Sequence, residues 1–292
     1  MFSNSISRLM HCVNSLRKML MKKNSALLLA LTAISLAASF SVPVLAEDAP
    51  PVEHTLTGNI GLFSSYRFRG IDQTFGQPAL QGGVDYTHAS GFYAGNWNSN
   101  ISSGAGYPEG NLEMDFYGGY KASFSDFGID VGGLYYYYPG TDLTITNRGQ
   151  TNTGRVDNAE IYIAGSWKFL SLKYSHAISD YFAVPDSKGT GYLDLSANYD
   201  LGEGWGINGH LGHLNFRHVT DGSYTDWKLG VTKDISGWVV GAAYVDTNAK
   251  GDCGQGQFYC FSNSLSNQNV QNGSKTKDAG RGIAVVSVSR SF

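Results

Sequence analysis

Alternation of apolar and polar residues dominates the chain from about residue 55 to its end. The clearest case is the run Leu112-Glu113-Met114-Asp115-Phe116-Tyr117, in which apolar residues occupy every second position and the two acids fall between them. Successive side chains of a strand point to opposite faces, so this pattern predicts β-strands with one apolar and one polar face. No segment longer than a turn shows helical periodicity.

Segments of this kind recur along the chain, and the connections between them alternate between short and long. Outer-membrane barrels have the same asymmetry, with short periplasmic turns, longer external loops and an even strand number. The sequence therefore predicts an all-β fold, an antiparallel transmembrane β-barrel of about 12 strands with both termini periplasmic. The predicted strands lie near 55–70, 77–87, 91–101, 111–123, 127–138, 157–168, 170–178, 189–200, 205–216, 222–234, 237–247 and 281–292.

A soluble β-sandwich is the alternative, because it also has strands of alternating apolar and polar residues. The residue types at the strand ends distinguish a sandwich from a membrane barrel. Aromatic residues cluster there, as the girdles of a membrane barrel do. The last strand ends at Phe292, which is typical of the signal read by the barrel-assembly machinery, although Arg290 departs from that signal. Because lipid offers no partner to a free strand edge, strands in a membrane must close into a barrel. The aromatic residues are Tyr135 to Tyr138, Trp167, Tyr199, Trp205 and Trp238.

An export signal is predicted before the strands. Lys22 and Lys23 precede an uncharged, largely apolar stretch that ends in small residues, so a Sec signal peptide cleaved after Ala46 is expected. The alternative is an uncleaved anchor, for which the many Ser and Ala residues are poorly suited. Residues 1–20 are expected to be a mis-called start, because a signal peptide that begins at Met21 is already complete. The predicted parts after them are a signal peptide at 21–46, a short periplasmic tail at 47–54, and the barrel at 55–292 with a long external loop at 248–280.

Removal of this leader changes the charge and leaves two cysteines. The chain loses five bases and no acids, so 21 bases and 24 acids become 16 and 24, a net charge of −8. This balance gives no basic patch for a nucleic-acid partner. The mature part has no apolar run long enough for a spanning helix. Cys253 and Cys260 are close together in an exported chain, which predicts a disulfide, with two free thiols as the alternative.

Five runs of residues carry a resemblance to one family. They are Ser65-Tyr66-Arg67-Phe68-Arg69-Gly70-Ile71, Gln77-Pro78-Ala79-Leu80-Gln81-Gly82-Gly83, Ser90-Gly91-Phe92-Tyr93-Ala94-Gly95-Asn96-Trp97, Glu113-Met114-Asp115-Phe116-Tyr117-Gly118-Gly119-Tyr120 and Tyr224-Thr225-Asp226-Trp227-Lys228-Leu229-Gly230. Together they resemble the TorF porin family, also described as the Gcw_chp family of conserved hypothetical proteins, over most of 55–247 and the last strand. The resemblance implies an outer-membrane location and a pore, and it supplies neither a substrate nor catalytic residues.

The polar faces of the strands are expected to line the interior of the barrel. Their charges either set up a transverse field that selects small solutes, or pair with one another and fill the space. Barrels of eight strands are filled by side chains and those of sixteen hold water, so twelve strands fit a narrow or plugged channel. The predicted lumen-lining residues are Asp85, Glu113, Asp115, Asp130, Glu160, Asp194, Asp226, Arg67, Arg69, Lys168, Lys173 and Lys228.

An outer-membrane hydrolase is the competing enzyme class. It would need a histidine base, for which His176, His210, His213 and His218 are the candidates. His210 and His213 have opposite parity on one predicted strand and so face opposite sides. No G-x-S-x-G motif is present. The sequence therefore predicts no catalytic residue, cofactor or metal site.

A non-conducting barrel with a surface-binding or structural role is the third class, because the loop 248–280 is long and polar. Such loops either fold into the lumen or contact other surfaces. We expect a porin of the bacterial outer membrane, in contact with its lipids, that lets a small solute diffuse through a narrow, mixed-charge lumen. The sequence does not identify the solute.

Overall fold

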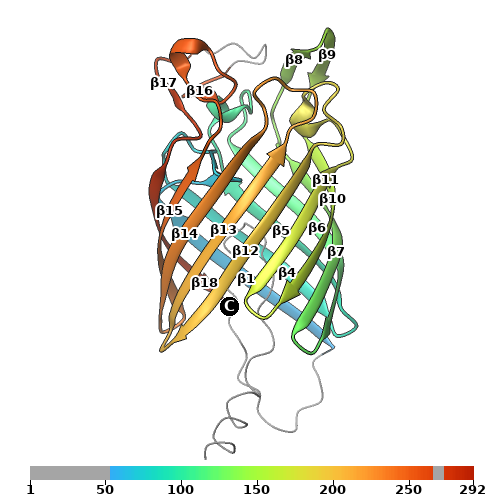
Figure 1. Ribbon diagram of the computed structural model, residues 1–292, viewed down its shortest axis with the longest axis vertical. Helices are drawn as coiled ribbons and strands as arrows, with labels where there is room; N and C mark the ends of the chain where they lie inside the picture. Colours follow the sequence, from blue (N-terminus) through green and yellow to red (C-terminus); the bar gives the residue numbers. More distant parts are fainter. Residues whose placement is uncertain (1–52, 266–272) are drawn as a thin grey trace, which may run out of the picture. The chain divides into compact units, whose positions relative to one another are not determined.

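A closed antiparallel barrel is the main feature of the computed structural model, which describes residues 53–265 and 273–292 (Figure 1). Strand β1 pairs with β4 on one side and with β18 on the other, and this pairing closes the sheet. The order around the barrel is β1-β18-β15-β14-β13-β12-β11-β10-β7-β6-β5-β4. These strands are β1 (His54–Phe63), β4 (Ala79–His88), β5 (Phe92–Asn100), β6 (Leu112–Phe124), β7 (Phe127–Tyr137), β10 (Asn158–Trp167), β11 (Leu170–Ala177), β12 (Gly191–Gly202), β13 (Trp205–Asn215), β14 (Tyr224–Ile235), β15 (Trp238–Thr247) and β18 (Ile283–Ser291).

The predicted antiparallel barrel is confirmed, because each of the twelve predicted segments overlaps one strand of this twelve-stranded barrel. The periplasmic position of both termini stays a prediction. The predicted start at Met1 or Met21, the signal peptide with cleavage after Ala46, and most of the tail lie outside the described residues and stay predictions. No helix in the described part of the chain is long and apolar enough to cross a membrane.

The two ends of the barrel differ in their connections (Figure 1). At the end where β1 begins and β18 ends, neighbouring strands are joined by short turns; we call this the turn end. Two of these turns, Glu203-Gly204 and Ser236-Gly237, have positive φ at both central residues, as the tight turns of twisted hairpins require. The opposite end, here the loop end, carries the long connections.

Burial alternates along the strands. In β12, Leu193 and Leu195 are about half exposed on the outer face, whereas Asp194 and Ser196 between them are buried. The same alternation on other strands gives an outer surface of apolar side chains and an inner wall of polar ones. This is the arrangement of a barrel whose outer face contacts lipid.

The connection between β1 and β4, residues 64–78, folds into a small hairpin of β2 (Arg67–Phe68) and β3 (Ile71–Asp72). Its turn consists of Arg69 and Gly70, with φ values of 48° and 80°. The predicted strand 55–70 is therefore too long, because this left-handed turn reverses the chain after β1 has ended.

Two further connections at the loop end contain hairpins. One is β8 (Leu143–Asn147) with β9 (Gln150–Gly154), and the other is β16 (Cys260–Ser262) with β17 (Thr276–Asp278). The second lies within the predicted loop 248–280, where Cys253 and Cys260 form a disulfide.

Aromatic side chains from the connections fill the loop end of the barrel. One cluster contains Tyr66, Tyr107 and Tyr138, and a second contains Tyr181 and Tyr259. Because these side chains pack against inward-facing residues of the wall, the loop end has a hydrophobic core of its own.

Candidate channel lumen

Arg69 connects the inserted hairpin to the opposite wall of the barrel. Its guanidinium donates to both carboxylate oxygens of Glu160 on β10, at 3.0 and 2.7 Å. Arg69 and Glu160 are 4% and 3% exposed. In the strand order β10 lies five places from β1, nearly half-way around the barrel. The β2–β3 hairpin therefore reaches across the interior, and we call the Arg69–Glu160 pair the latch.

Tyrosine hydroxyls surround the latch. Arg69 donates to the Tyr181 hydroxyl at 2.8 Å, and the Tyr224 hydroxyl donates to the Arg69 carbonyl at 2.9 Å. The guanidinium carbon lies 4.3 Å from the ring centroid of Tyr192. These partners satisfy a buried charge pair, which is stable only when its remaining hydrogen-bonding groups find partners.

The base of the hairpin is held by the connection between β15 and β18. Arg67 donates to the Ala279 carbonyl at 2.9 Å, and its guanidinium lies 3.5 Å from the Asp72 carboxylate. Lys277 of β17 lies 3.1 Å from the same carboxylate. Burial lowers the pKa of Arg67 and of Lys277, and Asp72 opposes this effect in both. Asp72 therefore holds two cations of the loop end together.

Two acids of β6, Glu113 and Asp115, face inward near Tyr66, the residue that precedes the hairpin. The Tyr66 hydroxyl donates to Glu113 at 3.2 Å. Asp115 is fully buried, and neither of its carboxylate oxygens has a hydrogen-bond partner among the described residues. A buried carboxylate without a partner is costly as an anion. The charge of Asp115 therefore has no compensating group bonded to it among the described residues.

His210 joins two acids of neighbouring strands. Its Nδ1 lies 2.7 Å from Asp194, and its Nε2 lies 2.9 Å from Asp226. Ser196 donates a further hydrogen bond to Asp194. With both ring nitrogens on carboxylates, His210 has none left to take a proton from a hydroxyl nucleophile.

The other hydrolase candidates do not converge with His210. His213 is exposed on the outer face of β13, opposite in parity to His210 as predicted. His176 is on β11, and His218 lies in the connection between β13 and β14, 3.0 Å from Asp186. The described residues thus place no histidine beside a nucleophile in the lumen.

Toward the turn end the inner wall is less buried. Tyr117 donates to Asp85 at 2.5 Å, and Tyr93 donates to Asp130 at 2.6 Å. The side chains of Lys121 and Asp130, whose charged atoms are 3.9 Å apart, are 33% and 19% exposed. Solvent therefore reaches inward-facing charges in this half of the barrel.

The structure gathers most of the predicted lumen residues on the inner wall, in two sets. Glu113, Asp115, Glu160, Asp194 and Asp226 are buried, whereas Asp85, Asp130, Lys173 and Lys228 are half-buried, with Lys173 4.0 Å above the Tyr162 ring.

Three predicted lumen residues lie elsewhere than on the wall. Arg67 and Arg69 are inside the barrel, but on the inserted hairpin, because β1 ends at Phe63. Lys168 is in the exposed turn between β10 and β11, with its amine 5.0 Å above the Trp167 ring. Its positive φ of 53° belongs to that turn and removes it from the alternation of the strand.

Sequence reasoning missed several polar residues of the interior, among them Lys121, Asp72 and Tyr181. Lys121 has inward parity on β6 and could have been found from the alternation. Asp72 and Tyr181 lie in connections, and no periodic pattern places them.

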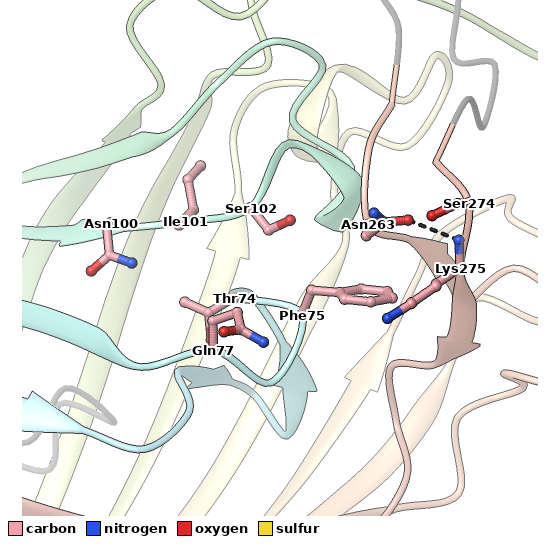
Figure 2. A pocket seen from close by; sticks show the side chains of 9 residues that line it. All are labelled: Thr74, Phe75, Gln77, Asn100, Ile101, Ser102, Asn263, Ser274 and Lys275. Carbon is pink, nitrogen blue, oxygen red and sulfur yellow. Dashed lines mark hydrogen bonds between the residues drawn. The ribbon is translucent and has the colours of Figure 1, made fainter.

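A polar pocket of about 530 Å³ lies on the rim of the loop end (Figure 2). Figure 2 shows side chains from three connections, among them Phe75, Ser102 and Lys275. The Lys275 amide donates to Asn263 at 2.9 Å. The pocket is beside the hairpin and is separate from the latch residues.

Comparison with known proteins gives the family. A family model described as a bacterial protein of unknown function (Gcw_chp) matches residues 46–273. The chain belongs to the Gcw_chp family. That confirms this part of the predicted resemblance, while membership of the TorF porins stays a prediction. No curated protein matches the Gcw_chp chain in sequence.

Solved structures similar to this Gcw_chp protein include three from outer-membrane barrels. The KdgM porin has a TM-score of 0.46 at 11% identity, over 81% of this chain and 99% of that one. The NanC porin has a TM-score of 0.44 at 10% identity, over 82% and 99%. OmpT of Vibrio cholerae has a TM-score of 0.40 at 11% identity, over 82% and 97%. Likeness at this level carries no conclusion about the lumen or its solute.

Proposed function

We propose that this Gcw_chp protein is an outer-membrane channel for small polar solutes, closed at its loop end by the inserted connection 64–78. The gradient of exposure along the inner wall carries the proposal. Inward-facing charges near the turn end, such as Lys121 and Asp130, are partly exposed, whereas Glu113 and Glu160 near the loop end are buried. A barrel built only as a filled scaffold has no need of solvated charges inside.

The orientation follows from the lengths of the connections. Outer-membrane barrels place short turns in the periplasm and long loops outside. On this basis the turn end faces the periplasm, both barrel termini lie there, and the hairpin closes the external side. Carboxylates outnumber lysines among the wall residues named above, so we expect the open channel to prefer cations.

A non-conducting barrel with a surface-binding role is the second candidate. The aromatic core of the loop end favours it, because Tyr107, Tyr138 and Tyr181 are almost fully buried and stabilise the connections against the wall. In this case the hairpin would be a permanent part of the core. The two candidates differ in whether breaking the latch produces conductance.

The variant Arg69→Ala tests the proposal in planar bilayers. It leaves Glu160 buried and unpaired, and removing one partner of a buried pair typically costs about 3–5 kcal/mol. Most of this free energy should be lost from the closed state of the channel. We therefore expect channel openings to become at least about tenfold more frequent than in the wild type. Reversal potentials in a salt gradient should show preference for cations.

Arg155→Ala is the matched control, because Arg155 is an exposed arginine paired with Asp157 at 3.1 Å outside the lumen. It should behave as the wild type. A folded Arg69→Ala barrel with no conductance would favour the surface-binding candidate.

A further inference from the structure

Glu53, His54 and His88 converge at the turn end of the barrel, on its outer face. Their ligand atoms all lie within 4.8 Å of one another. The Nε2 atom of His88 is 3.4 Å from one Glu53 oxygen, and that of His54 is 3.9 Å from the other. We propose that these three residues bind Zn²⁺ or a similar divalent transition-metal ion.

The barrel itself builds this arrangement. His54 at the start of β1 and His88 at the end of β4 are direct partners in the strand register. Opposed residues of an antiparallel pair have Cβ atoms about 4.5–5.5 Å apart and project to the same side. The Ala89 amide donates to the Glu53 carbonyl at 2.9 Å, which carries the pairing one residue beyond the strand. The backbone pairing thereby brings two imidazoles and a carboxylate to one rim.

Each imidazole has an outer partner on its other nitrogen. The Nδ1 of His54 lies 2.8 Å from the Tyr86 hydroxyl, and that of His88 lies 2.6 Å from the Ser90 hydroxyl. The Ser90 amide also donates to Nδ1 of His88, at 3.1 Å. A metal-bound histidine nearly always donates the N–H of its second ring nitrogen to such a partner, which orients the ring and fixes its tautomer. The Tyr86 hydroxyl can accept that proton from His54, and the Ser90 hydroxyl can accept it from His88. In both rings Nε2 is the atom directed at Glu53. Because the Ser90 amide donates to Nδ1 of His88, binding an ion through Nε2 requires the His88 proton to move to Nδ1 and the ring to turn from that amide toward the Ser90 hydroxyl.

The donor set suits zinc. Two imidazole nitrogens and one carboxylate with a fourth position left to water form a tetrahedral site of the open kind. The side chains of Glu53, His54 and His88 are 70%, 62% and 29% exposed, so an ion has free access, and the side chains can move together to the bond lengths of about 2.0–2.2 Å that zinc needs. Because the ligands come from β1 and β4, the ion would fasten the first strand of the barrel at its start.

The spacing of these residues in the sequence does not indicate a metal site. His54 and His88 are separated by a full hairpin and form no short metal motif. Only the strand register brings them together.

Calorimetric titration of Zn²⁺ into the full-length chain tests the proposal. The protein should be expressed without a histidine tag, extracted from membranes in detergent and freed of metal with a chelator. We expect one ion per barrel. His88→Gln and His54→Gln should each abolish it, and Tyr86→Phe should weaken binding by about tenfold through loss of the outer partner. These positions are at the rim, and circular dichroism would verify that each variant is folded.

His213→Gln is the matched control, because His213 is an exposed outer-face histidine whose Nδ1 contacts Thr225. It should bind zinc as the wild type does. The proposal is overturned if the wild type binds no zinc, if His88→Gln binds it equally well, or if His213→Gln removes it. Channel activity does not enter this measurement, so its outcome is independent of the proposed function.

Discussion

At the scale of single residues, small side chains on the inner wall make room for tyrosines that cross them. Tyr93 of β5 lies opposite Gly119 of β6 and passes over it to donate to Asp130 of β7. A Cβ atom at Gly119 would lie 2.5 Å from the Tyr93 hydroxyl and 2.4 Å from the Val131 carbonyl oxygen. The glycine therefore permits a hydrogen bond that spans three strands.

Gly119→Ala should destabilise the barrel by about 1–3 kcal/mol, because the added methyl group forces Tyr93 away from Asp130. Gly165→Ala is the control, since a Cβ atom there would have no neighbour within 4 Å. Urea titration of the two variants in lipid vesicles, followed by tryptophan fluorescence, measures the free energy of unfolding. Equal values for both variants would contradict this role of Gly119.

Parity along a strand indicates which face of the wall a residue lies on, but it cannot predict the partners of that residue. Glu113 and Asp115 face inward as their alternation requires. The partner of Glu160, in contrast, is Arg69, which is 91 positions away in a connection. Such a contact depends on how a loop folds back, and a periodic pattern carries no information about that.

At the scale of elements, the outer row of β12 shows what a spanning strand requires. Leu195 lies midway along the strand and is 47% exposed, and Leu201 lies near the turn end, beyond Tyr199, and is 58% exposed. Both are exposed leucines, so exposure alone does not distinguish them. In a membrane the two leucines would differ in depth, with Leu195 near the centre of the bilayer and Leu201 near its surface.

Leu195→Arg should cost about 2–4 kcal/mol and Leu201→Arg only about 0–1 kcal/mol, because the cost of a charge on the lipid face falls from the bilayer centre to its surface. The same urea titration in vesicles provides the comparison. A soluble barrel would tolerate both changes equally, and that result would contradict a membrane location.

Strand boundaries were predictable where the alternation ends at a short turn and were not where it continues into a connection. The segment 127–138 differs from β7 by a single residue at its end. The predicted segment 55–70 extends seven residues beyond Phe63, where β1 ends. Arg67 and Phe68 form the short strand β2, so the strand pattern continues past the end of β1. Gly70 is the residue of this turn that the sequence could have indicated, because glycine readily adopts its φ of 80°.

At the scale of the whole molecule, closure of the barrel follows from the unpaired edges that lipid forbids. The even strand number lets the first and last strands pair antiparallel. The sequence therefore predicts the wall. It does not predict whether the interior is open, because that depends on connections whose aromatic residues pack by long-range contacts. Tyr107 and Tyr138, for example, stack with ring centroids 4.2 Å apart although they belong to different connections.

The central claim is that connection 64–78 closes a polar channel. Phe63 and Ala79 are direct cross-strand partners, so residues 65–77 can be replaced by an Asn-Gly turn without separating β1 from β4. A control variant shortens the β8–β9 hairpin at its tip, residues 147–150. This hairpin also lies at the loop end but supplies neither residue of the latch.

Single-channel recording in planar bilayers compares these two variants with the wild type. The account predicts discrete, cation-preferring conductance steps for the variant without the inserted connection, and rare or no steps for the wild type and the β8–β9 control. A folded barrel that lacks residues 65–77 and still does not conduct would contradict it.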